Sequence, residues 1–210
     1  MNRVQNIVKR ILYNVRFVDP TILVALSILA SKQSKATTQT IKNLHQLLDY
    51  LVTHPDAKIW YYASNMILIV PLDASYLSAK YARSRVSGHL FLWWTTQEKH
   101  PIHLNGENST LCNILKCISD STAVAELGAQ FWNANESKMV ILTLRELEHP
   151  QPPTPIYCKN ATATGISDGT VKRQQSRSME MRYFYIFDTV IHREVKLNLH
   201  PGQENLGNYT

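Results

Sequence analysis

The sequence predicts an α/β domain that follows a small all-helical segment. Two patterns predict this. Up to about residue 55, apolar residues recur every three or four positions, as on one face of a helix. Beyond Pro55, short apolar and aromatic runs predict three strands, two helices, a strand, a helix and a strand. The 210 residues suit one domain of ordinary size with an appendage.

Three helices are expected before residue 55. The first covers residues 4–15, and Asp19-Pro20 then supplies an N-cap and a first-turn proline for a second helix through Ser31. The third runs from Thr38 to Thr53, where His54-Pro55 ends it. Because no acidic residue precedes Asp19, the first helix also fits a mitochondrial presequence, although a core-facing helix is favoured.

The remaining residues favour strands first and then alternating elements. The expected strands are Ile59–Tyr62 with Met66–Leu72, Val86–Trp94, Ile102–Leu104, Ile156–Cys158 and Val195–His200. The expected helices are Thr122–Asn135, Lys138–Glu148 and Ser176–His192. Pro71 lies in the second of these runs. It lacks the N–H that a residue of a central strand donates to the neighbouring strand, and this loss costs little only if Pro71 lies in the last turn of the strand.

Composition and charge limit the classes of function. The net charge is +6, and residues 1–58 carry most of it, with 8 basic and 3 acidic side chains. This balance suits a polyanionic partner as well as an ordinary soluble surface. The longest apolar run, Ile22–Ala30, is far shorter than the roughly 20 residues of a membrane span. Three cysteines do not form a disulfide framework, so we expect an intracellular protein, cytoplasmic or nuclear, that is not secreted and not in a membrane.

Few side-chain groups indicate a particular chemistry. His100, His103, Cys112 and Cys117 are ligand types that zinc accepts, but the pairs are too closely spaced for a usual zinc module, and the cysteines fit a helical face. No phosphate-binding glycine motif or nucleophile elbow occurs. Asp73 follows an apolar strand directly, where we expect a cleft, and Glu126 interrupts a largely apolar helix. Taken alone, the first is more often a turn residue and the second a surface residue.

A succession of short segments resembles the C-terminal part of copia-type retrotransposon polyproteins, over residues 18–208 and in the correct order. The segments are Val18-Asp19-Pro20-Thr21 to Pro55, Asp73-Ala74-Ser75-Tyr76, Ala125-Glu126-Leu127-Gly128-Ala129, Pro152-Pro153-Thr154-Pro155-Ile156, Met179-Glu180-Met181-Arg182-Tyr183 and Pro201-Gly202-Gln203-Glu204-Asn205-Leu206. The resemblance implies that residues 1–55 correspond to the end of a reverse transcriptase, without its catalytic aspartates. It implies that residues 56–210 form a ribonuclease H-like mixed five-stranded sheet flanked by helices, truncated at the C-terminus.

The resemblance also implies a site. In the family, four acids hold two Mg²⁺ ions, which cut the RNA strand of an RNA–DNA hybrid. When the four acid positions of the family are matched to this sequence, the first two are Asp73 and Glu126, but the third position holds Lys159 and the fourth holds Asn208. An ammonium about 4 Å from a divalent ion costs roughly 8 kcal/mol at an effective dielectric near 20. We therefore expect a degenerate ribonuclease H with weak or lost Mg²⁺ binding and impaired or no cleavage.

Other interpretations remain open. The domain is alternatively a non-catalytic module in which Lys159, with Lys172, Arg173 and Arg177, contacts the phosphates of hybrid or duplex nucleic acid. Lys172, Arg173 and Arg177 also fit a solvated loop and the start of a helix. A remaining reverse transcriptase segment is a further expected partner, and a functionless relic is the third interpretation.

Overall fold

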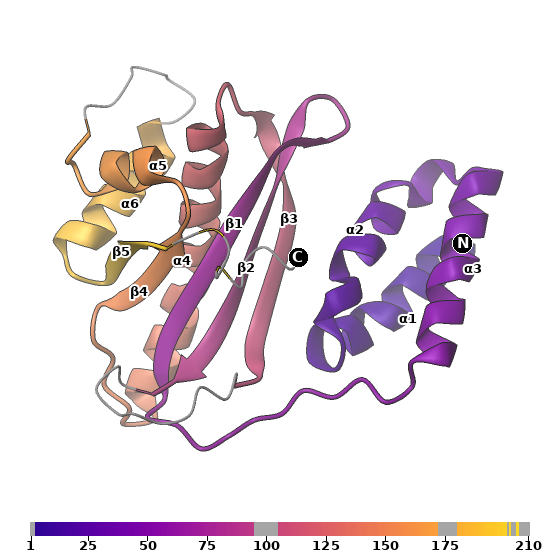
Figure 1. The fold of residues 1–210 in the computed structure, drawn as a ribbon, viewed down its shortest axis with the longest axis horizontal. Helices are drawn as coiled ribbons and strands as arrows, with labels where there is room; N and C mark the ends of the chain where they lie inside the picture. The colour runs from indigo at the N-terminus through magenta and orange to yellow at the C-terminus, as the bar shows by residue number, and fades with distance from the viewer. Residues whose placement is uncertain (1–2, 95–104, 172–179, 201, 203–204, 206–210) are drawn as a thin grey trace. The chain divides into compact units, whose positions relative to one another are not determined.

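The computed structural model describes residues 3–94, 105–171, 180–200, 202 and 205, which divide into two compact units at Trp60 (Figure 1). The first unit holds α1 (Arg3–Phe17), a short turn at Pro20–Ile22, α2 (Leu23–Ser31), a second turn at Gln33–Lys35 and α3 (Thr38–Thr53). All three expected helices are present. Asp19 accepts a hydrogen bond from the Thr21 N–H at 3.2 Å, and Thr37 forms a capping box with Thr40 at the start of α3.

The apolar stripes of these helices meet in a core of their own. Val4, Val8 and Val15 of α1 are buried, as are Leu26 of α2 and Leu44 of α3. The core-facing interpretation of the first helix is therefore confirmed. Within the described residues, no helix is both long enough and apolar enough to cross a bilayer.

The second unit is built on a mixed five-stranded sheet in the order β3-β2-β1-β4-β5 (Figure 1). β1 pairs antiparallel with β2, and β2 with β3, whereas β4 runs parallel to β1 and β5 parallel to β4. The strands are β1 (Ile67–Ala79), β2 (Arg83–Trp93), β3 (Glu107–Ile118), β4 (Thr154–Cys158) and β5 (Val195–Leu199), and the helices are α4 (Thr122–Glu146), α5 (Ala161–Ser167) and α6 (Glu180–Ile191).

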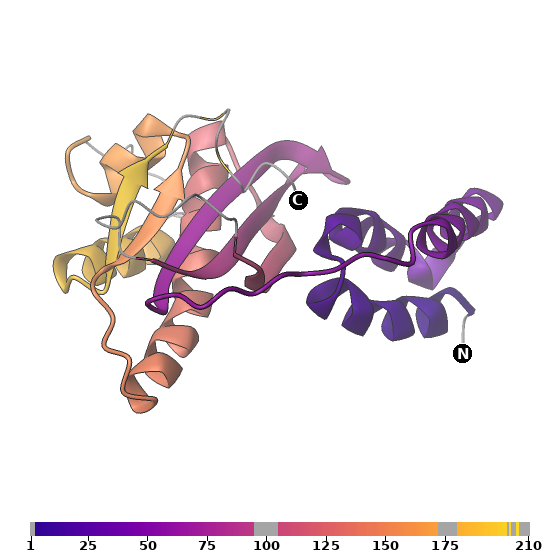
Figure 2. The same cartoon turned by 60° about the horizontal axis from the view of Figure 1, so that its bottom comes forward.

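The main core lies between one face of this sheet and its helices. Alternate residues of β1, Leu68, Val70 and Leu72, are fully buried against α4, which crosses β1 and β2 (Figure 2). Ile156 of β4 and Ile186 of α6 belong to the same cluster. The close approach of α4 requires a glycine on β2, because a Cβ on Gly88 would lie 1.9 Å from the Asn133 side-chain oxygen.

Several expected elements differ from the structure. β1 runs on to Ala79 instead of ending at Leu72. The sequence did not indicate this length, because the hairpin turn that follows has Tyr81 and Ala82 at positive φ and carries none of the usual Asn-Gly signals. Residues 59–62 form no strand. The expected strand Ile102–Leu104 and the first residues of Ser176–His192 lie outside the described residues.

Two further differences concern β3 and the helices. Cys112 and Cys117 lie on β3, so their assignment to a helical face was wrong; polar residues along this strand conceal its two-residue period. The two helices expected over residues 122–148 are one continuous helix, α4, since nothing between Asn135 and Lys138 breaks it. The short helix α5 was not expected, because Thr and Gly give it little helix propensity.

Pro71 lies within β1, not in its last turn. The pairing of β1 with β2 covers Ile67–Ile69 and resumes at Leu72 in the same register, and Val70 and Pro71 pair with β4 instead. The missing N–H thus coincides with a local gap in the ladder that leaves the register intact.

Candidate functional site

Asp73 occupies the middle of β1, so its expected place at the end of a strand was wrong. Its neighbours in sequence, Leu72 and Ala74, are buried in the core, whereas its own side chain is 15% exposed. Asp73 Oδ1 accepts a hydrogen bond from the Ala74 N–H at 2.7 Å. The carboxylate is therefore held close to the backbone at the centre of the sheet, within reach of water.

Lys159 lies directly after β4, the parallel neighbour of β1. Because Pro71 is in register with Tyr157, the residue two places after each stands at the same level of the sheet. Lys159 Nζ lies 2.5 Å from Asp73 Oδ1, with 34% of the lysine side chain exposed. The strand register thus places an ammonium group on the first carboxylate of the expected site.

Glu126 lies in the second turn of α4, after the Ser121 cap, and is fully buried. Burial first, and then the nearby charge of Asp73, raise the pKa of Glu126 to about 8, while Lys159 and the Cys158 thiol oppose the rise. Cys158 Sγ lies 3.7 Å from Glu126 Oε2, and Oε1 has no hydrogen-bond partner among the described residues. At neutral pH this side chain is mostly a neutral carboxylic acid.

Two residues beside Glu126 were not expected in the site. Burial, followed by the charge of Glu126, raises the pKa of Cys158 to about 11, so its thiol stays protonated and donates. Gln130, one turn after Glu126, is fully buried and accepts from Ser167 Oγ at 2.6 Å. The i, i+4 spacing of two polar residues in an apolar helix is the signal in the sequence that would have found Gln130.

These residues do not fit a Mg²⁺ centre. Mg²⁺ requires near-octahedral oxygen ligands and charge neutralisation by carboxylates. Here the ammonium of Lys159 cancels the charge of Asp73, Glu126 holds its proton near neutral pH, and a neutral thiol stands beside it. Within the residues that the structure describes, no three Asp, Glu, His or Cys side chains are grouped to hold a metal.

Some expected site residues are not placed. Asn208, Lys172, Arg173 and Arg177 lie outside the described residues, as do His100 and His103. The two cysteines of the zinc alternative are described and do not converge. They are five positions apart on β3, and each is contacted by a different arginine: Cys112 by Arg85 at 3.6 Å and Cys117 by Arg182 at 3.0 Å.

Comparison with known proteins finds similarity in structure alone. No family model matches the sequence, and no curated protein matches it. Among solved structures, the foamy viral protease–reverse transcriptase in complex with RNA/DNA hybrid aligns with a TM-score of 0.53 and 11% identity, over 98% of this chain and 25% of that one.

Two other similar structures are ribonucleases H. LC11-RNase H1, isolated from compost by a metagenomic approach, aligns with a TM-score of 0.49 and 10% identity, over 67% of this chain and 88% of that one. The N-terminal ribonuclease H domain of a Mycobacterium tuberculosis protein aligns with a TM-score of 0.46 and 8% identity, over 67% and 86%.

The fold is therefore ribonuclease H-like: a mixed five-stranded sheet flanked by helices and preceded by N-terminal helices. The chain corresponds to about a quarter of the foamy viral enzyme.

Proposed function

We propose that this chain is a degenerate ribonuclease H domain from a copia-type retrotransposon, joined to the end of its reverse transcriptase. By descent it is a two-metal endonuclease for the RNA strand of RNA–DNA hybrids; in its present form it binds nucleic acid and cuts slowly or not at all. The observation that carries the proposal is the 2.5 Å ion pair between Lys159 and Asp73. The LC11 ribonuclease H1 and the foamy viral enzyme were each solved with an RNA/DNA hybrid, which supports this choice of partner.

The charge of the site argues against tight metal binding. Asp73 and Lys159 sum to zero, and Glu126 adds little charge below pH 8. A divalent ion about 4 Å from the ammonium is opposed by roughly 8 kcal/mol at an effective dielectric near 20. Even a quarter of that opposition lowers affinity by more than tenfold. Metal binding would require Lys159 to swing away into solvent.

A second function, phosphate binding without cleavage, is favoured by the exposure of Lys159. One third of its side chain reaches solvent, so the ammonium can contact a backbone phosphate while it stays near Asp73. We propose that Lys172, Arg173 and Arg177 add sequence-independent contacts to the same duplex.

A cleavage assay tests the first function. Wild type, Lys159→Asp, Asn208→Asp and the double variant are compared on a labelled RNA–DNA hybrid with Mg²⁺ and with Mn²⁺. We expect cleavage to rise only in the double variant, which restores both acids. Lys80→Asp, in the exposed β1–β2 turn, is the control for the same change of charge. Equal rates in all proteins, or tight binding of two Mg²⁺ ions by wild type in calorimetry, would refute the degenerate site.

Hybrid binding tests the second function. Fluorescence anisotropy across a salt series should show binding that weakens with salt, and Lys159→Ala should reduce the salt slope by about one. A slope that the variant leaves unchanged would exclude Lys159 from the interface. A folded wild type that neither cuts nor binds hybrid would leave the relic interpretation.

A further inference from the structure

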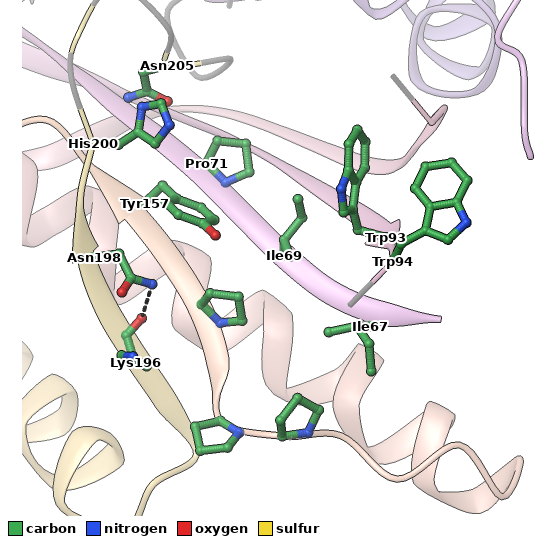
Figure 3. A pocket seen from close by; sticks show the side chains of 13 residues that line it. Ile67, Ile69, Pro71, Trp93, Trp94, Tyr157, Lys196, Asn198, His200 and Asn205 are labelled. Atoms are coloured by element: carbon green, nitrogen blue, oxygen red, sulfur yellow. Dashed lines mark hydrogen bonds between the residues drawn. The ribbon is translucent and has the colours of Figure 1, made fainter. Parts of the chain in front are cut away.

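The hairpin between β1 and β2 lies at one end of the sheet (Figure 1). On its β4 side, β1 has neighbours as far as Leu72: Pro71 lies beside Tyr157 of β4 (Figure 3), and Asn205 Nδ2 donates to the Leu72 carbonyl oxygen at 2.8 Å. The hairpin continues beyond this level to its turn. We call this outer part, residues 76–84, the hairpin arm.

The backbone of the arm is strained. Leu77, Tyr81 and Ala82 have φ angles of 53°, 62° and 52°, in the left-handed region that favours glycine. Residues 76–84 contain no glycine, although glycine would relieve this strain. Strain of this kind concentrates at functional sites, so the side chains that hold these positions are candidates for a binding role.

Basic and aromatic side chains gather on the arm. Tyr81 is 82% exposed at the turn, next to Lys80, which is also exposed. Arg83 is half-buried and pairs with Ile118 of β3, and Lys116, two residues before Ile118, is exposed. With Lys116 beside it, the arm thus offers three cations and one exposed ring.

Acids are scarce around these cations. The described residues between Asp73 and Asp120 include one acid, Glu107, which contacts His89 at the far end of β3. Asp120 lies just beyond β3, where its carbonyl oxygen accepts from the Tyr76 hydroxyl at 3.3 Å. The three cations form no ion pair with a described side chain. Their charge therefore favours an anionic partner.

The arm lies close to the candidate site. Ser87 of β2 pairs with Asp73, and Arg83 lies four residues before Ser87, a distance of about 13 Å along the strand. Nucleotides of a duplex follow one another about every 3.4 Å along its axis. A duplex that contacts Lys159 would therefore reach the arm about four base pairs away.

We propose that the hairpin arm binds the junction between a nucleic-acid duplex and a single strand. The three cations contact backbone phosphates, and Tyr81 stacks on the first unpaired base. The base must be unpaired, because bases within a duplex already stack on one another. This inference rests on the proposed function for its nucleic-acid partner, and it adds the form of the nucleic acid and a second contact region.

Fluorescence anisotropy with the full chain tests the arm. The probes are a labelled blunt-ended RNA–DNA hybrid and the same hybrid with a single-stranded DNA extension. Wild type should bind the extended hybrid about fivefold or more tightly than the blunt one, and Tyr81→Gly should remove most of this preference. Replacing both Arg83 and Lys116 with Gln should reduce the salt slope by about two on both probes. Lys80→Asp, the charge control of the cleavage assay, should also weaken hybrid binding, so cleavage is compared at protein concentrations that saturate the hybrid.

Matched variants separate the ring from the backbone of the turn. Tyr81→Gly and Ala82→Gly each relieve one left-handed residue of the same turn, so neither should lower Tm by more than about 2 °C. Only Tyr81→Gly should lose the preference for the extended hybrid. Replacing Arg145 and Arg193 with Gln removes the same charge as the double variant from exposed positions elsewhere, and should leave the salt slope within about 0.5 of wild type.

The outcomes distinguish the arm from the site around Lys159. Equal affinity of wild type for both probes, a preference that Tyr81→Gly leaves intact, or one that Ala82→Gly also abolishes would overturn the proposal. Weaker binding by Lys159→Ala with unchanged binding by the arm variants would refute the arm alone, whereas a folded wild type that binds neither probe would refute the nucleic-acid partner as well. Binding to phosphatidylserine vesicles that Tyr81→Gly abolishes, with hybrid binding unchanged, would overturn the proposal in favour of a membrane surface.

Discussion

Replacing Glu126 with glutamine should stabilise the protein, and more so as pH rises. Folded Glu126 keeps its proton up to about pH 8, whereas an ordinary glutamate loses it near 4.5. Between these two values the folded state binds a proton that the unfolded chain releases. The unfolding free energy of wild type therefore falls as pH rises through this window and levels off above about pH 8.

The magnitude follows from the width of the window. Each pH unit within it costs wild type about 1.4 kcal/mol, so the loss reaches about 3 kcal/mol at pH 7. A glutamine side chain has the same shape and no proton to lose, so Glu126→Gln removes this dependence. Near pH 5 the two proteins should differ little. At pH 8 the variant should be more stable by about 3 kcal/mol or more, which raises Tm by roughly 6–12 °C for a chain of this size.

Urea unfolding of wild type and variant at pH 5, 6, 7 and 8 measures this difference, since other ionisations cancel in the comparison. Glu136→Gln is the matched control, because Glu136 lies on the same helix, α4, and is exposed. It should change stability by less than about 0.5 kcal/mol at every pH. A difference between wild type and Glu126→Gln that is the same at pH 5 and pH 8 would refute the buried neutral acid.

Three further sets of substitutions test the packing around the site, all by urea unfolding. Lys159→Ala and Asp73→Asn should be coupled by about 1 kcal/mol in a double-mutant cycle, because the pair is partly exposed; additive effects would contradict the ion pair. Gly88→Ala should cost about 2–3 kcal/mol, since its Cβ would overlap Asn133; adding Asn133→Ala should recover part of the loss, and no recovery would locate the strain elsewhere. Asn160→Ala should cost about 1 kcal/mol by removing the cap of α5, and an unchanged midpoint would show that the cap contributes nothing.

Local patterns predicted much of the fold. The helices of the first unit follow from their apolar stripes and caps, and β4 and β5 from short apolar runs. The extension of β1 to Ala79 and the position of β3 did not follow. The extension of β1 depends on the β1–β2 hairpin, whose turn adopts positive φ at Tyr81 and Ala82, residue types with no preference for that conformation. The position of β3 was missed because polar residues along the strand conceal its two-residue period.

The candidate site divides in the same way. The residue types were visible in the sequence: one Asp after an apolar run, one Glu in an apolar helix, and a lysine where the resemblance implies an acid. That Lys159 contacts Asp73, and that Glu126 is buried enough to hold its proton, were decided by the parallel register of β1 and β4 and by the packing of α4. Sequence determines which ionisable groups are present, because each residue carries its own. Only the tertiary structure determines their separation and their distance from water, because elements far apart in the chain supply both.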